Sequence, residues 1–183
     1  MVIYELGYNP PKSDAECCSI NRGSFMFNGS SLKNSWTRPE VFSLQYGKTY
    51  YDLIKMDMAD IVLLSDSALQ KLLPFIGESI ESLPVNCSFG NFSLINTTKV
   101  IDAFDFIKSD YTVFRCNPTT DSGKPNIKFI NKYSFRPEVL DENLYIFKVN
   151  DISVCPIFVT DKFKTLVEKL NLTGFTFKKI WSS

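Results

Sequence analysis

The segment between residues 155 and 181 constrains the fold most, because its apolar side chains follow first a strand pattern and then a helix pattern. β-Branched and aromatic residues favour a strand over residues 157–159. Thr160 or Asp161 can cap the helix that follows, since a short side-chain oxygen accepts a hydrogen bond from a first-turn N–H. The apolar residues of this helix recur at i, i+3, i+4 and i+7 and therefore share one face: Phe163, Leu166, Val167 and Leu170.

The same segment is expected to end in a second strand. Gly174 is expected to supply the left-handed backbone conformation that follows many helices. Phe175 and Phe177 alternate with polar residues, as in a half-buried strand. The segment therefore predicts a strand–helix–strand unit whose apolar side chains enter the core, and none of its residues indicates a reaction.

A looser copy of this pattern lies roughly 95 residues earlier in the chain. Residues 59–64 indicate a strand, and Ser65 with Asp66 forms a cap signal. Gly77 is expected to end the helix, and residues 80–85 indicate the second strand. Apolar residues recur along this helix at the same spacing: Leu69, Leu72, Leu73 and Ile76. Two similar units are a sign of an internal duplication or of two related lobes.

The chain as a whole favours an α+β fold with a mixed or antiparallel sheet and a few short helices. Residues 144–149 form a strong strand pattern, and residues 116–126 indicate a loop or hairpin tip. Residues 1–50 are irregular, and we expect them to pack on the core of an α+β domain formed by residues 51–183. Three aromatic residues are expected to anchor this N-terminal segment: Phe25, Phe27 and Trp36.

The charges cancel over the chain, with 20 basic and 20 acidic residues, but they are unevenly distributed. Residues 1–110 have a net charge of −4 and residues 111–183 a net charge of +4. The stretch 40–110 holds 10 acidic and 5 basic residues, which argues against nucleic-acid binding there and suits a basic protein partner. The alternative is that each half simply has a solvated face.

The cysteine and histidine content bears on cofactors and on the cellular compartment. The chain has no histidine and no C-x-x-C pair, and its five cysteines are Cys17, Cys18, Cys87, Cys116 and Cys155. Zinc sites of the usual kinds therefore lack half of their ligand types, and we expect no cofactor. Reduced thiols in a cytoplasm are the simplest interpretation. The N-terminus shows no signal-peptide pattern and no stretch approaches about 18 apolar residues, so we expect a cytoplasmic protein that does not enter a membrane.

Closely spaced aspartates are the candidates for acid–base or divalent-metal chemistry. Asp102 and Asp105 would come together on a helix or tight turn, and Asp57 and Asp60 form a weaker pair. The alternative is that these aspartates cap turns after strands. A serine or cysteine nucleophile would lack the usual histidine base. The segment Ser122-Gly123-Lys124-Pro125 lacks the spacing and the following helix of a phosphate-binding loop.

Three segments together resemble a known bacterial family. They are residues 93–111, in which an Asn-bearing strand leads to Asp102, Asp105 and Lys108-Ser109; residues 144–149, which resemble the family's next strand; and residues 159–177, which resemble its closing unit. The family is one of the immunity-protein families of polymorphic toxin systems. The resemblance covers about residues 55–181.

The resemblance implies a protein that is encoded beside a toxin, binds the toxin domain tightly and protects the producing cell. It would be a stoichiometric inhibitor that covers the toxin's active site, and not an enzyme, since the family offers no catalytic residue. Together with the acidic stretch, the resemblance leads us to expect four contact residues: Asp102, Asp105, Asp110 and Tyr111. Two alternatives stay open, namely a hydrolase that uses Asp102 and Asp105, and a non-catalytic adaptor module.

Overall fold

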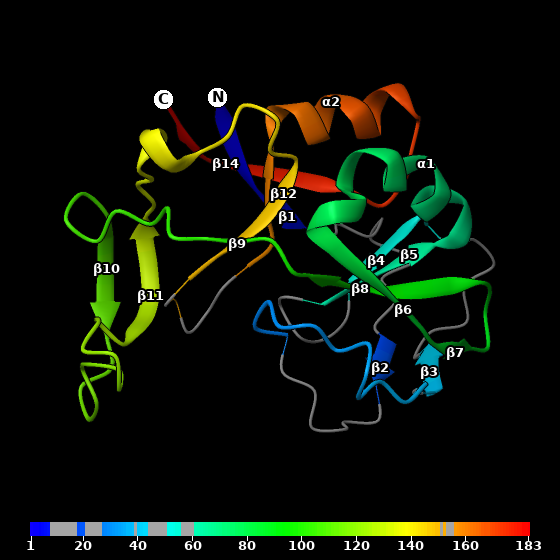
Figure 1. The fold of residues 1–183 in the computed structure, drawn as a ribbon, viewed down its shortest axis with the longest axis horizontal. Helices are drawn as coiled ribbons and strands as arrows, with labels where there is room; N and C mark the ends of the chain where they lie inside the picture. Colours follow the sequence, from blue (N-terminus) through cyan, green and yellow to red (C-terminus); the bar gives the residue numbers. More distant parts are fainter. Residues whose placement is uncertain are drawn as a thin grey trace.

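The α+β class is confirmed by the computed structural model of the protein. The residues that the structure describes are 1–7, 18–20, 27–38, 40–43, 51–55, 61–150, 152 and 156–183. Within these ranges, two α-helices accompany several antiparallel or mixed sheets (Figure 1). Several residues considered above lie outside them: Cys17, Phe25, Asp57, Asp60 and Cys155.

The first strand–helix–strand unit forms where the sequence predicts it. Its elements are β4 Leu53–Lys55, β5 Val62–Ser65, α1 Asp66–Ile76, the 3₁₀ helix η1 Gly77–Ser79, β6 Ile80–Pro84 and β8 Phe92–Thr97. β5 leads directly into α1, and η1 connects α1 to β6. β8 lies between β5 and β6 and is antiparallel to both, while β4 borders β5 on its other side.

The second predicted unit also forms, in a five-stranded sheet. Its elements are β1 Val2–Gly7, β9 Val100–Ile101, β12 Ile146–Val149, β13 Phe158–Thr160, α2 Asp161–Lys169 and β14 Thr176–Ser182. The strand order is β14-β1-β13-β12-β9, in which only the pairing of β12 with β9 is parallel among these described strands. β1 therefore lies between β13 and β14 and is antiparallel to both.

The two units share one arrangement. In each, the strand before the helix and the strand after it are parallel to each other, and one antiparallel strand lies between them. This middle strand is β8 in the first unit and β1 in the second. In each, a further antiparallel strand borders the first strand: β4 beside β5, and β12 beside β13. They differ in how the chain reaches the inserted strand, because β8 follows β6 whereas β1 comes from the other end of the sequence.

Both helices bury their apolar faces in one shared core, and Figure 1 shows them above the sheets. α1 contributes Leu69, Leu72 and Ile76 to it, and α2 contributes Phe163 and Val167. Half-buried side chains pack against this core from the second unit: Leu166, Leu170, Phe175 and Phe177. Leu73, which the spacing places on the apolar face of α1, is exposed instead, because the buried face of the helix is centred on Ala68 and Leu72.

The two helices begin at the predicted residues but use them differently. The hydroxyl of Ser65 caps α1 by accepting a hydrogen bond from the N–H of Ala68 at 3.2 Å. Thr160 occupies the cap position of α2, yet its hydroxyl donates to the carbonyl oxygen of Leu144 at 2.6 Å. The hydroxyl of Thr160 therefore ties β13 to the preceding chain and does not cap the helix.

Gly174 has the predicted left-handed conformation, but it is not the residue that ends α2. Asn171 takes that role with φ 51°. The N–H of Leu172 donates to the carbonyl of Val167 and the N–H of Asn171 to that of Glu168, both at 3.1 Å, which is the hydrogen-bond pattern of a Schellman motif. The reason is that asparagine tolerates the left-handed region, so the helix ends before it reaches the glycine.

Gly174 lies where the chain that follows α2 comes very close to the backbone at the start of β4. Its φ is 85°, and a Cβ placed on it would contact the carbonyl oxygen of Leu53 and lie 2.7 Å from the Cβ of Tyr51. Gly123 has a similar φ of 77°, but a Cβ there would meet nothing within 4 Å. A comparison of alanine substitutions at the two glycines therefore separates the free-energy cost of the left-handed backbone from that of the steric clash.

We expect Gly174→Ala to lower the free energy of unfolding by about 3 kcal/mol, from left-handed strain plus displacement of the Leu53 backbone. The matched variant Gly123→Ala is expected to cost only the strain, about 1 kcal/mol. Urea unfolding followed by circular dichroism measures both. Equal losses for the two variants would show that the close approach at Gly174 contributes nothing.

Part of the N-terminal segment crosses the first unit as a strap, which we define as residues 27–38. Phe27 is buried in the core of that unit, and Trp36 packs against it while its Nε1–H donates to the carbonyl oxygen of Pro84 at 2.8 Å. Both residues thus act as the packed anchors that we expected. β1, in contrast, is an inner strand of the five-stranded sheet. The domain boundary at residue 50 stays a prediction.

Buried polar side chains hold the strap against the sheets. Glu81 Oε2 accepts hydrogen bonds from the N–H of Leu32 at 2.9 Å and from Asn96 Nδ2 at 3.0 Å. Lys148 Nζ donates to the carbonyl oxygen of Phe27 at 2.5 Å. Three of these residues belong to the strands beneath, namely Glu81 to β6, Asn96 to β8 and Lys148 to β12. The strap is therefore fixed by groups that would be costly to bury without partners.

The remaining elements form a small sheet and a hairpin. Their bounds are β2 Cys18–Ile20, β3 Glu40–Ser43, β7 Asn86–Cys87, β10 Asp110–Val113, β11 Ile127–Lys132 and the 3₁₀ helix η2 Pro137–Val139. β2, β3 and β7 lie in that order in one sheet, and β10 pairs with β11 in a separate antiparallel hairpin. Figure 1 shows the hairpin projecting to the left of the two units. Its tip contains the loop predicted over residues 116–126.

Candidate interaction surface

The four predicted contact residues all lie at the root of the hairpin β10–β11. Asp102 and Asp105 lie in the segment that leads from β9 to β10, and Asp110 and Tyr111 begin β10. This segment pairs with the chain that leaves β11, so that the antiparallel ladder continues from the hairpin toward the core. The structure therefore brings the four residues to one region.

Asp105 shapes the turn that precedes β10. Its Oδ1 accepts hydrogen bonds from the N–H groups of Lys108 at 3.1 Å and Ile107 at 3.0 Å, and its Oδ2 lies 3.6 Å from Lys108 Nζ. The N–H of Lys108, aided by that of Ile107 and by the lysine charge, holds the pKa of Asp105 below its usual value of 3.8 despite some desolvation. This geometry is that of an aspartate capping a turn.

Asp102 has a different partner. Its Oδ2 lies 2.8 Å from Nη2 of Arg136, and the same guanidinium nitrogen donates to the carbonyl oxygen of Asp102. The carboxylates of Asp102 and Asp105 are therefore engaged by separate groups, Arg136 for one and the turn N–H groups for the other. The two carboxylates therefore hold different parts of the chain.

Asp110 and Tyr111 occupy opposite environments although they are neighbours. Asp110 is exposed at the start of β10, where its backbone lies opposite that of Lys132 in the strand register. The ring of Tyr111 is half-buried, with its centroid 6.2 Å from that of Phe106 and 6.3 Å from that of Phe104. Tyr111 thus joins the hairpin to the aromatic core, while Asp110 is accessible to a partner.

The hairpin also exposes large apolar side chains that no sequence pattern singled out. Phe129 in β11 is 60% exposed, and Phe114, directly after β10, is 40% exposed. Both line a hollow of about 740 Å³ together with Arg115 and Lys128. We call the part of the surface formed by these four residues the hairpin hollow. Exposed apolar groups gathered in this way mark sites of protein contact.

The hairpin is basic as well as apolar. Residues 106–133 hold five basic and two acidic residues, a net charge of +3 in a chain whose total is zero. Lys128 Nζ lies 5.2 Å from the ring centroid of Phe129, and Lys124 Nζ lies 5.9 Å from that of Phe106. The charge of this surface favours an acidic partner, whereas the acidic stretch 40–110 favours a basic one.

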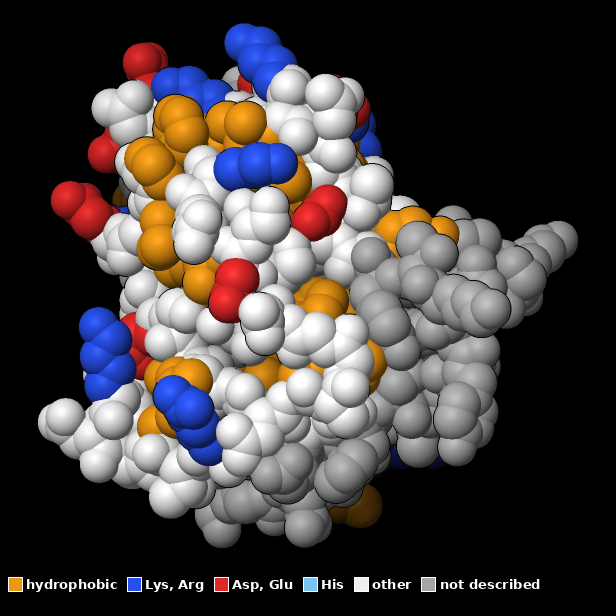
Figure 2. All heavy atoms as spheres, turned by 90° about the vertical axis from the view of Figure 1, so that its right-hand side faces the viewer, with side chains coloured by type: hydrophobic (Ala, Val, Ile, Leu, Met, Phe, Trp, Pro, Cys, Tyr) orange, Lys and Arg blue, Asp and Glu red, His pale blue; other side chains and the backbone are white. Residues whose placement is uncertain are grey.

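A second exposed apolar group lies at the C-terminal end of α1. Phe75 is 46% exposed, its ring centroid is 5.8 Å from that of Tyr145, and the two side chains line hollows of about 500 and 450 Å³. The right-hand side of the molecule in Figure 1, which faces the viewer in Figure 2, also carries hydrophobic side chains over its upper part, with basic and acidic side chains among them. Charges of both signs line these hollows, including Glu78 and Lys99, so this region favours neither charge in a partner.

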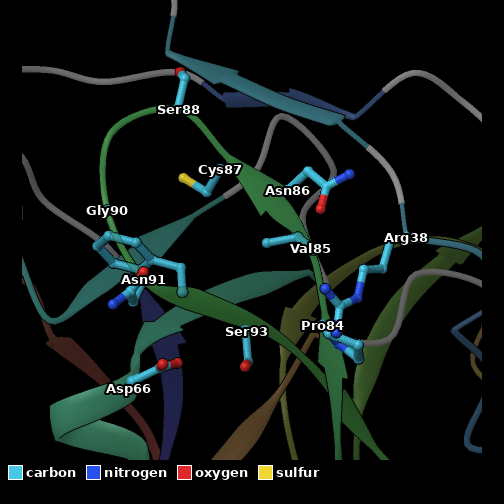
Figure 3. A pocket seen from close by; sticks show the side chains of 11 residues that line it. Arg38, Asp66, Pro84, Val85, Asn86, Cys87, Ser88, Gly90, Asn91 and Ser93 are labelled. Atoms are coloured by element: carbon cyan, nitrogen blue, oxygen red, sulfur yellow. The ribbon is translucent and has the colours of Figure 1, made fainter.

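A polar hollow of about 490 Å³ lies between β7, β8 and the start of α1 (Figure 3). Arg38, Asp66 and Cys87 line it, and in Figure 3 the carboxylate of Asp66 and the thiol of Cys87 do not point toward each other. These groups come from three separate elements and do not form a nucleophile–base pair. The hollow is therefore a weaker candidate than the hairpin.

Two further features of the described residues concern metal binding and membrane insertion. Within those ranges, no group of three or more cysteine, aspartate or glutamate side chains is arranged to hold a metal ion. Neither helix of the described ranges is long and apolar enough to cross a membrane.

The geometry thus describes an α+β protein with an exposed, basic hairpin, in which Asp105 holds a turn and Asp102 pairs with Arg136. The family described as "Immunity protein family (Imm11)" matches residues 88–182, which is more than half of the chain. The chain belongs to this immunity protein family. The resemblance stated above is confirmed, although the match begins at residue 88 and not near residue 55. No curated protein matches the chain.

Proposed function

We propose that the chain binds a cognate toxin domain and neutralises it by covering its active site, without catalysing a reaction. Membership of the immunity protein family is the observation that carries this proposal. The toxin would be encoded by a neighbouring gene, and the complex would form in the cytoplasm of the producing cell. The partner is a protein, and neither a nucleic acid nor a membrane.

The shape of the hairpin supports inhibition by occlusion. A projecting two-stranded element with exposed aromatic side chains can enter a cleft of a partner, and tight inhibitor interfaces of about 1,600 Å² depend on a few such anchors. Asp102 and Asp110 are exposed at the root of the hairpin, and we assign them to the polar rim of the interface. Asp105 and Tyr111 would contribute indirectly by holding the turn and the strand.

The alternative of a hydrolase has less support. Asp102 pairs with Arg136, and Asp105 caps a turn through the N–H groups of Ile107 and Lys108. A general base must reach the proton that it removes, and these carboxylates are already committed to different partners. A non-catalytic adaptor would share the hairpin surface but would not protect a cell from a toxin.

Co-expression with the toxin encoded by the neighbouring gene tests the proposal. We expect cells that produce the toxin domain to survive only when this protein is present in at least equal amount, because a stoichiometric inhibitor must occupy every toxin molecule. Colony counts across a range of induction ratios measure this. Equal killing with and without the protein would contradict the proposal.

A double variant separates inhibition from hydrolysis in the same assay. Asp102→Asn with Asp105→Asn is expected to fold, because an asparagine oxygen at position 105 can still accept from the N–H groups of Ile107 and Lys108. An inhibitor should then retain most of its protection. Loss of protection by a folded double variant that still binds the toxin would favour the hydrolase.

A further inference from the structure

We infer that the hairpin hollow, formed by Phe114, Arg115, Lys128 and Phe129, is the contact surface for the toxin, and that it binds an acidic patch with an apolar centre. This inference rests on the proposed function, because it names the surface through which the inhibition would occur. It assigns the main contact to the basic side of the molecule, and not to the acidic stretch 40–110.

The apolar part of the argument comes from the exposure of two phenylalanines. Phe129 and Phe114 are 60% and 40% exposed although they lie in or directly beside paired strands. Leaving such rings in water is unfavourable, whereas burying them in an interface provides the aromatic anchors on which binding energy concentrates. Both rings border one hollow, so a single partner surface can cover them together.

The charge of the surface identifies the chemistry of the partner. Arg115 and Lys128 line the same hollow as the two phenylalanines. Acidic groups are scarce in this part of the chain, where residues 106–133 carry a net charge of +3. An acidic partner surface would therefore be attracted over a distance, which speeds encounter, and would place carboxylates opposite the rim of the apolar centre.

The hairpin is supported from behind, which reduces the cost of binding. On its inner side, Tyr111 packs against Phe104 and Phe106, and Ile127 is buried. A surface that is already ordered loses little conformational entropy when a partner docks. Among the described strands, β10 and β11 pair only with each other.

A nucleic acid would recognise some of the same features, but the observations favour a protein. Binding of nucleic acid commonly uses about six to ten phosphate contacts. The hairpin segment holds five basic residues, and one of them, Lys108, is within ion-pair distance of Asp105. The charge is sufficient for an acidic protein surface and small for a polyanion.

The test compares two double variants in binding to the toxin domain encoded by the neighbouring gene, isolated from the co-expressed complex. The hairpin variant is Lys128→Glu with Phe129→Ala. The control variant is Lys71→Glu with Phe75→Ala on α1, where a lysine and a comparably exposed phenylalanine are replaced in the same way. Thermal unfolding first establishes that both variants remain folded.

We expect the dissociation constant of the hairpin variant to rise at least about 30-fold and that of the control variant to change less than about threefold. The association rate of the unaltered protein should fall on the order of tenfold between low and high salt, and the hairpin variant should lose most of this dependence.

The possible failures are distinguishable. If the unaltered protein does not bind the toxin domain, the proposed function fails and the inference fails with it. If the unaltered protein binds and the folded hairpin variant binds equally well, only the hairpin inference is overturned. A larger loss for the control variant would move the interface to α1, and saturable binding of single-stranded DNA or RNA in place of the toxin would assign the hairpin to nucleic acid.

Discussion

A Phe158→Ala variant is expected to lose about 4 kcal/mol of unfolding free energy, the largest loss among the single substitutions considered. Phe158 is fully buried in β13, and its ring centroid lies 5.4 Å from that of Phe135, 5.5 Å from that of Phe147 and 5.6 Å from that of Tyr133. Removing this ring leaves a cavity bounded by rigid aromatic side chains in the centre of a sheet, where relaxation is limited.

The matched control for this variant is Phe129→Ala, which removes the same side chain from an exposed position. We expect it to change the free energy of unfolding by less than about 1 kcal/mol. Chemical unfolding of both variants, monitored by tryptophan fluorescence and circular dichroism, measures the difference. If Phe158→Ala costs no more than Phe129→Ala, the aromatic core does not carry the stability assigned to it here.

A Glu81→Ala variant is expected to lose about 3 kcal/mol of unfolding free energy, because it leaves buried hydrogen-bond donors under the strap without an acceptor. The N–H of Leu32 and the amide of Asn96 both donate to the Glu81 carboxylate, and Glu81 and Asn96 are buried. A buried donor without an acceptor bears the full cost of desolvation. Glu78, three residues earlier and exposed, provides the control Glu78→Ala, for which a change below about 0.5 kcal/mol is expected.

The same carboxylate makes the stability of the protein dependent on pH. Burial raises the pKa of Glu81, but hydrogen bonds from Ser31, Leu32 and Asn96, together with the charge of Lys33, outweigh it and leave the pKa below its ordinary value of 4.5. The folded state therefore binds the Glu81 proton less readily than the unfolded chain. Its contribution is complete above about pH 4.5 and is lost as the pH falls through the lower, folded-state pKa.

A Glu81→Gln variant measures this contribution. Unfolding free energies of the variant and the unaltered protein are compared from pH 7 down to pH 3. We expect the difference between them to shrink as the pH falls below about 4.5, since protonation makes the glutamate resemble the neutral amide. A difference that stays constant over this range would show that the carboxylate charge contributes nothing to stability.

Local periodicity was sufficient to predict the two strand–helix–strand units. The spacing of Leu69, Leu72 and Ile76, and that of Phe163 and Val167, identifies helices because only a helix brings such residues to one face. The apolar spacing was less informative about where each helix ends. It could not show that Asn171 would stop α2 before Gly174, because both residue types accept the left-handed conformation.

Strand partners could not be predicted in the same way. β1 pairs with β13 and β14, whose residues follow it by more than 150 positions. Its short sequence, Val2–Gly7, carries no record of which distant strands will border it. The buried polar side chains under the strap could not be predicted for the same reason. Glu81, Asn96 and Lys148 come from three strands that only the tertiary structure brings together.

The four expected contact residues were chosen from the sequence without a prediction that they lie together. Asp102, Asp105, Asp110 and Tyr111 are at one end of the hairpin, and their role in contact with a partner stays a prediction. Phe129 looked like an ordinary strand residue. An alternating pattern shows that a strand has two faces, but it does not show which face another layer will cover. Exposure of Phe129 therefore required the structure.

The insertion of β1 between β13 and β14 has a consequence for how the protein matures on the ribosome. The first unit is continuous, from β4 to β8, and can assemble while synthesis proceeds. The second cannot close its sheet until residues as late as Ser182 have emerged, because both neighbours of β1 follow it by more than 150 positions. Such distant pairing slows folding. We therefore expect the pairing of β1 with β13 and β14 to form late in folding.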